Sequence, residues 1–180
     1  IAAMVSLRNT GATHFVVLCP ASVIINWCRE IGKFSKLRAI KVHGSTRWSA
    51  IDEWIRTGGV AVTTYETTAY FKLPDDFKFS MLVVDEAHYI KNPDANRSIN
   101  TRAICAHAQR LLFMTGTALE NNVEEMVNLI DILRPDIAKQ ISHMKMLSSA
   151  PQFREKVANL YTDTIIFLSS DFASSIISSI

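Results

Sequence analysis

Two short, uninterrupted apolar runs constrain the fold of this chain more than any other feature. The first, Phe15 to Cys19, reads FVVLC and is stopped by Pro20, and the second, Met81 to Val84, reads MLVV and leads into two acidic residues. A run without alternating polar residues suits a strand that is buried on both faces, as in a parallel sheet covered by helices on both sides. The two runs therefore favour an α/β fold.

Helical patterns separate these two runs from further candidate strands. Three such strands are residues 38–43, 60–64 and 111–114. The helical patterns are residues 1–7, which read as the end of a helix, an apolar stripe from Ile24 to Phe34, another from Trp48 to Ile55, and residues 94–108 and 122–133. Ser22 and Ser45 are candidate caps for the two stripes, and Trp27, Trp48 and Trp54 fall at core-facing positions. Strands alternating with helices predict a parallel sheet with helices on both faces.

The composition supports a single folded domain with a tail. The chain has 180 residues, of which 48% are hydrophobic and 20% charged, and this excludes a disordered chain. The formal net charge of +2 means that a nucleic-acid partner would be held by local patches and not by overall charge. Residues 161–180 are rich in serine and isoleucine and contain no lysine or arginine, so we expect a domain over residues 1–160 and a tail outside the fold.

Cysteine usage and apolar run lengths indicate the compartment. The three cysteines are an odd number and form no Cys-x-x-Cys pair, so neither a disulfide framework nor a structural zinc site is expected. A reducing intracellular setting follows, either cytoplasm with its nucleoid or nucleus. No apolar run reaches the roughly 18 residues of a membrane span, and no basic region precedes the apolar start, so no membrane partner is expected.

Asp85 and Glu86 come directly after the apolar run of residues 81–84. Ligands of open α/β sheets bind at the carboxyl ends of the strands, where these two acids would lie. Adjacent carboxylates repel each other unless a cation or a polarised water shares the site, and magnesium bound to phosphates fits this need. Alternatively, the two acids only begin a helix or turn, where they complement its dipole. A zinc protease is excluded, because the two histidines four residues apart are missing.

The order and spacing of several motifs resemble a known family. Val84 to His88 is similar to the DEAH form of the Walker B motif of superfamily-two helicases, and Thr115-Gly116-Thr117 is similar to their third motif. The flanking segments narrow the match; they are IKN after the DEAH box, TGTALEN from Thr115, CPAS before the Trp27 helix, and TTYE from Thr63. Over roughly residues 1–160, these motifs together resemble the Swi/Snf-type DNA-dependent ATPases, which implies a RecA-like lobe that uses ATP and magnesium.

The resemblance implies roles at the nucleotide. Asp85 would hold Mg²⁺ through its water shell, Glu86 would be the catalytic base, and His88 would link the nucleotide site to neighbouring motifs. Thr115, Gly116 and Thr117 would couple the nucleotide state to DNA contact. Two alternatives remain open: His88 is an ordinary polar residue at a helix start, and the two threonines only cap a strand-to-turn junction.

The resemblance also implies a double-stranded DNA partner. Pro20, Ala21 and Ser22 lie where a strand runs into a helix, and free backbone N–H groups there suit a phosphate. Thr63, Thr64 and Tyr65 occupy a similar turn, and both turns would touch the DNA backbone without reading its sequence. Plain capping is the alternative for both turns. Lys91 and Asn92 match the family and either touch DNA or brace the loop.

Two departures from the family bear on activity. Ala118 replaces a proline that many relatives carry, a mild change, and no Gly-Lys-Thr or Gly-Lys-Ser phosphate loop occurs in the chain. The family places that loop before the helix that begins IAAM, so we expect an N-terminally truncated first lobe that lacks its second RecA-like partner lobe. Two hypotheses follow. The chain is part of an ATP-driven DNA translocase that remodels protein–DNA complexes and is itself inactive, or it is a non-catalytic DNA- or protein-binding module or decayed gene product.

Overall fold

Five parallel strands form the sheet of the computed structural model, which describes residues 1–115, 129, 131 and 132. The strands are β1 (His14–Leu18), β2 (Ala39–Val42), β3 (Gly59–Thr63), β4 (Met81–Asp85) and β5 (Leu111–Met114). They lie in the order β2-β3-β1-β4-β5, and every neighbouring pair is parallel. The predicted α/β fold with a parallel sheet is therefore confirmed.

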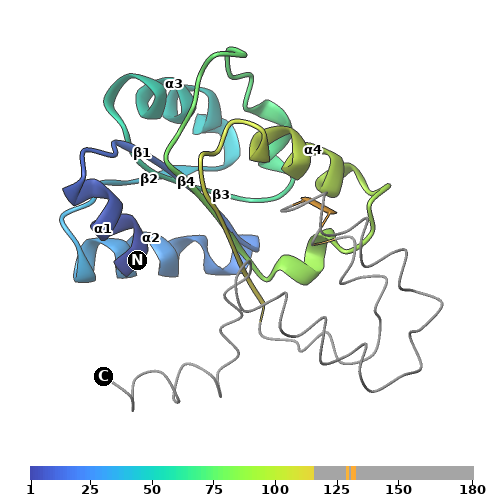
Figure 1. Ribbon diagram of the computed structural model, residues 1–180, viewed down its shortest axis with the longest axis horizontal. Coiled ribbons are helices and arrows are strands. Elements are labelled where there is room, and N and C mark those ends of the chain that lie inside the picture. The colour runs from blue at the N-terminus through green and yellow to red at the C-terminus, as the bar shows by residue number, and fades with distance from the viewer. Residues whose placement is uncertain (116–128, 130, 133–180) are drawn as a thin grey trace.

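Helices cover both faces of this sheet (Figure 1). The α-helices are α1 (Ala2–Asn9), α2 (Ile24–Phe34), α3 (Arg47–Thr57) and α4 (Asn96–Cys105). Short 3₁₀ turns precede or replace helices at four places, η1 (Ala21–Val23), η2 (Gly44–Thr46), η3 (Thr67–Tyr70) and η4 (Ala87–Ile90). Helices α1 and α2 lie on one face, and α3 and α4 lie on the other (Figure 1).

Strand β1 shows why its run is wholly apolar. Phe15 and Val17 belong to the core under α1 and α2, together with Met4 and Ile31. The alternate residues, Val16 and Leu18, belong to the core under α3 and α4, and all four strand residues are 0% exposed. Since side chains alternate between the faces of a strand, both faces of β1 are buried, as the sequence predicts.

Two details of the helical patterns were predicted wrongly. Phe34, the last residue of α2, is 62% exposed, and Trp48, in the first turn of α3, is 47% exposed. Helical spacing gives the side of a helix on which a residue lies, but the ends of a helix can extend past the sheet that it covers. The predicted caps are also wrong, because Ser22 and Ser45 lie inside η1 and η2, so that α2 and α3 begin one 3₁₀ turn later.

Several predictions concern residues outside the described part of the chain. These are Gly116 and Thr117, the tail of residues 161–180 with its boundary, and nearly all of the predicted helix over residues 122–133, of which Leu129, Asp131 and Ile132 are helical. Within the described residues, no helix combines the length and the apolar character that crossing a membrane requires.

Candidate active site

The candidate residues gather at the carboxyl edge of the sheet. Each follows a strand: Pro20 after β1, Thr64 after β3, Asp85 and Glu86 at the end of β4, and Thr115 after β5. Because β3, β1, β4 and β5 are consecutive neighbours in a parallel sheet, their carboxyl ends form one continuous row. Residues far apart in the sequence are therefore brought to a single edge, where ligands of such sheets bind.

Asp85 ends β4, and its carboxylate is bound by a tryptophan. The indole Nε1 of Trp27, in α2, donates a hydrogen bond to Oδ2 of Asp85 over 2.7 Å. Partial burial raises the pKa of the Asp85 carboxyl, the Trp27 hydrogen bond opposes this shift, and the charge of Glu86 adds to it. The carboxylate is thus held in one orientation by a donor from a different element of the fold.

Glu86 has an unusual backbone conformation. Its φ of 56° and ψ of 52° are left-handed, and no other non-glycine residue in the described part of the chain has a positive φ. This conformation costs about 1–2 kcal/mol for a residue with a Cβ atom. The hydroxyl of Tyr65 holds the segment by donating to the carbonyl oxygen of Asp85, and it lies 3.3 Å from the carbonyl oxygen of Glu86. Such strain is concentrated at functional sites, which makes Glu86 a candidate.

Replacing Glu86 by glycine should therefore not destabilise the protein. Glycine adopts φ > 0 without the steric cost, so we expect a free energy of unfolding that is unchanged or higher by up to about 1 kcal/mol. Glu66 is the matched control, because it is exposed and has a right-handed φ of −72°. Glu66→Gly should lower the free energy of unfolding by about 0.5–1 kcal/mol in urea titrations. Equal losses for both variants would refute strain at Glu86.

His88 connects Glu86 to the residue that follows β5. Its Nδ1 lies 3.2 Å from Oε2 of Glu86 and 3.3 Å from Oγ1 of Thr115. Thr115 is buried, at 4% exposed, while His88 and Glu86 are partly exposed. The predicted members Glu86, His88 and Thr115 are thus in contact, although His88 and Thr115 are 27 positions apart in the sequence.

The residues predicted to touch DNA fall into two groups. Ala21, Ser22, Lys91 and Asn92 are exposed, and Pro20 is partly buried. Thr63, Thr64 and Tyr65 are buried, with 0%, 1% and 2% of their surfaces exposed. The hydroxyl of Thr63 donates to the Val42 carbonyl oxygen, and that of Thr64 pairs with the Thr67 hydroxyl. These three side chains thus bond inside the protein, and their contact with DNA stays a prediction.

Two residues at this edge have contacts that the sequence does not predict. Trp27 was interpreted as packing and Tyr65 as a DNA contact, yet both donate hydrogen bonds to the Asp85–Glu86 segment. The only local signal was the position of Tyr65, two residues after the end of β3. The contacts depend on the order of β3, β1 and β4 in the sheet, which local patterns do not give.

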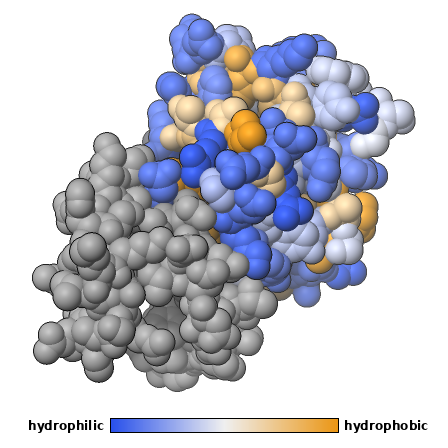
Figure 2. All heavy atoms as spheres, turned by 90° about the vertical axis from the view of Figure 1, so that its right-hand side faces the viewer, coloured by the Kyte–Doolittle hydropathy of each residue, from blue (hydrophilic) through white to orange (hydrophobic). Residues whose placement is uncertain are grey.

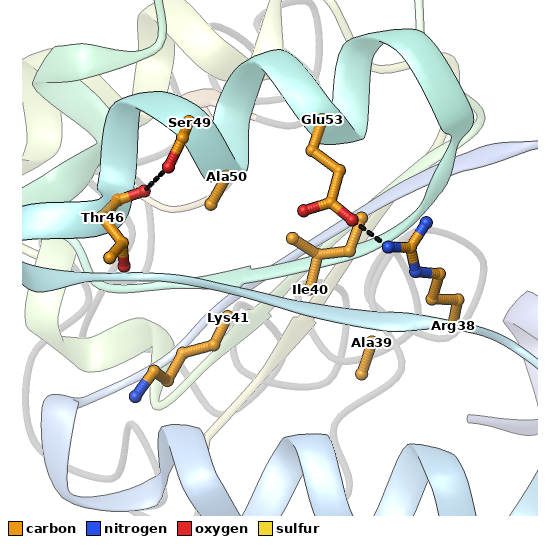
Figure 3. Close-up of a pocket in the computed structure, with 8 residues that line it drawn as sticks. All are labelled: Arg38, Ala39, Ile40, Lys41, Thr46, Ser49, Ala50 and Glu53. Carbon is orange, nitrogen blue, oxygen red and sulfur yellow. Dashed lines mark hydrogen bonds and ion pairs between the residues drawn. The ribbon is translucent and has the colours of Figure 1, made fainter.

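A cavity of about 350 Å³ lies at the opposite edge strand, between β2 and α3. Figure 3 shows its lining, where Arg38 and Glu53 form an ion pair and Lys41 points away from Glu53. β3 and β1 separate this cavity from β4. The cavity therefore forms no part of the carboxylate site.

Elsewhere, the described surface seen in Figure 2 is largely hydrophilic, with apolar residues in small separate patches.

Comparisons with known proteins point to one family. A family model described as the SNF2-related domain matches residues 2–167. The DNA excision repair protein ERCC-6-like of Danio rerio is 35% identical over 130 residues, covering 67% of this chain and 9% of that protein. ATP-dependent helicase fft3 of Schizosaccharomyces pombe is 35% identical over 140 residues, covering 72% of this chain and 15% of that protein.

The chain spans only a small part of such relatives. ATP-dependent helicase FUN30 of Saccharomyces cerevisiae is 34% identical over 139 residues, which are 72% of this chain but 12% of that protein. Among solved structures, the Sulfolobus solfataricus SWI2/SNF2 ATPase core in complex with dsDNA matches with a TM-score of 0.72. That match covers 91% of this chain and 35% of the other at 21% identity, and so shows a common fold.

Proposed function

Because the chain belongs to the SNF2-related domain family, we propose that it is most of the first RecA-like lobe of an ATP-dependent translocase on double-stranded DNA. The whole protein would hydrolyse ATP to remodel protein–DNA complexes. It would act where DNA is found, in the nucleus or in a nucleoid-containing cytoplasm. Relatives that are named ATP-dependent helicases support the ATPase part of the proposal.

The observation that carries the proposal is the pair of carboxylates at the end of β4. Asp85 is oriented by Trp27, and Glu86 is next to it in a strained conformation, in contact with His88. Carboxylate oxygens are ligands that Mg²⁺ prefers, so this donor set fits a magnesium–ATP complex. The bound ion would supply charge stabilisation for the transferred phosphoryl group.

Each candidate residue at this edge of the sheet would have its own role. Asp85 would hold Mg²⁺ through its water shell, and Glu86 would orient the attacking water and accept its proton. His88 would keep Glu86 in position while contacting Thr115, and Thr115, Gly116 and Thr117 would transmit the nucleotide state towards the DNA. The distances from Nδ1 of His88 to Oε2 of Glu86 and to Oγ1 of Thr115, 3.2 and 3.3 Å, support these roles because both are short enough for a hydrogen bond.

The exposed turns near the site would bind the DNA backbone. We assign Pro20, Ala21, Ser22, Lys91 and Asn92 to phosphate contacts. Thr63, Thr64 and Tyr65 would contribute from the adjoining turn, through the backbone or by shaping it. The exposure of Ala21, Ser22, Lys91 and Asn92 supports the first assignment. Contacts of this kind position a duplex without selecting a sequence.

A duplex-binding assay tests the DNA part. We expect an affinity that falls as salt rises, and a salt dependence that Lys91→Ala reduces by about one unit of slope. Lys36→Ala is the matched control, since Lys36 is exposed and precedes β2, at the amino edge of the sheet. No binding of duplex DNA, or equal effects of the two substitutions, would contradict the assignment.

The second candidate is a non-catalytic DNA- or protein-binding module. It is favoured by the exposure of Ala21, Ser22, Lys91 and Asn92, because contacts of these turns with a phosphate backbone need no nucleotide. The 180 residues themselves contain no Gly-Lys-Thr or Gly-Lys-Ser phosphate loop. Both candidates share one expected result: this chain alone hydrolyses ATP at background, with or without duplex DNA, because the β- and γ-phosphates lack their lysine. Phosphate release measures this. A DNA-stimulated rate that Glu86→Gln abolishes would refute the expectation and the second candidate together.

A further inference from the structure

We propose that Trp27 and Tyr65 are positioning residues that hold the Asp85–Glu86 pair and tie it to the turns that follow β1 and β3. The proposal rests on the proposed function, because it concerns the same two carboxylates and the same two turns. It gives those turns a second role, in which a movement of either turn changes the geometry of the carboxylates.

Trp27 connects the β1 turn to the side chain of Asp85. The turn consists of Pro20 and η1, and α2 continues from η1 without a break, so Trp27 lies just over one helical turn beyond Ser22. The indole ring packs against the core beneath α2 while its Nε1 donates to Oδ2 of Asp85 over 2.7 Å. A hydrogen bond to a carboxylate is stronger than one between neutral groups. A shift of α2 would therefore turn the Asp85 carboxylate with it.

Tyr65 lies in the turn that follows β3 and connects this turn to the backbone of Asp85 and Glu86. Its ring is 2% exposed and stacks on Tyr89 with ring centroids 5.6 Å apart and planes 9° apart. Its hydroxyl donates to the carbonyl oxygen of Asp85 and lies 3.3 Å from that of Glu86. Tyr65 thus contacts the Asp85–Tyr89 segment at both of its ends. The left-handed conformation of Glu86 lies between these two contacts, which explains how the strain is maintained.

The two connections have a thermodynamic consequence. If duplex DNA at the turns changes the affinity of the Asp85–Glu86 pair for Mg²⁺–ATP by some factor, then Mg²⁺–ATP at the pair must change the affinity for DNA by the same factor. Trp27 and Tyr65 each join one of the two turns to the pair by a hydrogen bond from the side chain. Trp27→Phe and Tyr65→Phe remove these hydrogen bonds and keep both carboxylates and the backbone of both turns.

The indole N–H signals of the full chain, labelled with ¹⁵N-tryptophan, test the Trp27 connection. The chain contains three tryptophans, and Trp27→Phe assigns the first of them. We expect Asp85→Asn to shift the Trp27 signal, because the amide that replaces the carboxylate carries no charge. The signal of Trp54, which donates to the Gly59 carbonyl oxygen, and that of exposed Trp48 should not move. An unmoved Trp27 signal, or equal shifts of all three, would overturn the proposal.

Hydrogen exchange tests the Tyr65 connection. Tyr65→Phe removes only the hydroxyl, and we expect exchange in residues 81–92 to become about tenfold faster while exchange in β1 and β3 is unchanged. Tyr70→Phe makes the same chemical change at an exposed ring and should leave residues 81–92 as they were. Unchanged exchange in Tyr65→Phe, or faster exchange throughout the sheet, would show that the hydroxyl does not hold this segment.

A short duplex added to the labelled chain tests the coupling itself. We expect the Trp27 signal to move when the duplex binds. The Trp27→Phe variant should still bind the duplex, and adding Asp85→Asn to that variant should no longer alter its affinity for the duplex. Binding that leaves the Trp27 signal in place would overturn the coupling. Failure of the chain to bind any duplex would instead refute the DNA part of the proposed function, and the two preceding measurements would still decide the positioning roles.

Discussion

Replacing Trp54 by alanine should lower the free energy of unfolding by about 3–5 kcal/mol. Trp54 is 0% exposed, and its ring makes edge-on contacts with the rings of His14, Phe71 and Phe79. Its Nε1 also donates to the carbonyl oxygen of Gly59 over 3.2 Å. The substitution would leave a large cavity under the sheet and remove this hydrogen bond at the start of β3. Urea denaturation followed by circular dichroism measures the loss.

Trp48 provides the matched control for this prediction. It lies in the same helix, is 47% exposed, and contacts the ring of Tyr70 at the surface. Trp48→Ala should therefore cost less than about 1 kcal/mol. Equal losses for the two variants would mean that α3 does not pack on the sheet through Trp54.

Replacing Gly59 by alanine should cost about 2–4 kcal/mol, the second-largest effect that we expect. Gly59 begins β3 with a φ of 102°, and a Cβ atom there would lie 2.6 Å from the carbonyl oxygen of Arg38. That oxygen accepts the hydrogen bond from Val60 N that joins β3 to the chain leading into β2, so it cannot move without loss. The same urea titration measures this effect.

Gly44 separates the two causes of the stability loss expected for Gly59→Ala, which are the positive φ and the steric overlap of the added Cβ atom. It also has a positive φ, of 70°, but a Cβ atom there would meet nothing within 4 Å. Gly44→Ala should therefore show only the conformational cost, about 1–2 kcal/mol. A loss for Gly44→Ala as large as that for Gly59→Ala would contradict the close approach of β3 to Arg38.

The sequence predicts the sheet well, because the reason for each strand is local. The run of residues 81–84 is apolar since both faces of β4 are covered, and this places Asp85 and Glu86 at a carboxyl end. Phe34 and Trp48 were predicted wrongly because the spacing of apolar residues does not show how far the sheet extends beneath a helix.

The contacts inside the candidate site could not be predicted in the same way. Trp27 and Asp85 are 58 residues apart, and they meet only because β1 and β4 are neighbours in the sheet. The left-handed conformation of Glu86 has no signal in the sequence, since Asp-Glu-Ala contains neither glycine nor asparagine. Tertiary structure imposes it, through the Tyr65 hydroxyl and the stacked rings of Tyr65 and Tyr89.

Paramagnetic broadening of the backbone amide signals by Mn²⁺ with ATP tests whether a magnesium–nucleotide site lies at the end of β4. Mn²⁺ replaces Mg²⁺ at oxygen sites, and broadening locates it even when binding is weak. We expect the amide signals of Glu86, Ala87, His88 and Thr115 to broaden first, and Asp85→Asn to abolish this effect. Broadening centred on the cavity between β2 and α3, or the same broadening in Asp85→Asn, would contradict a magnesium–nucleotide site at the end of β4.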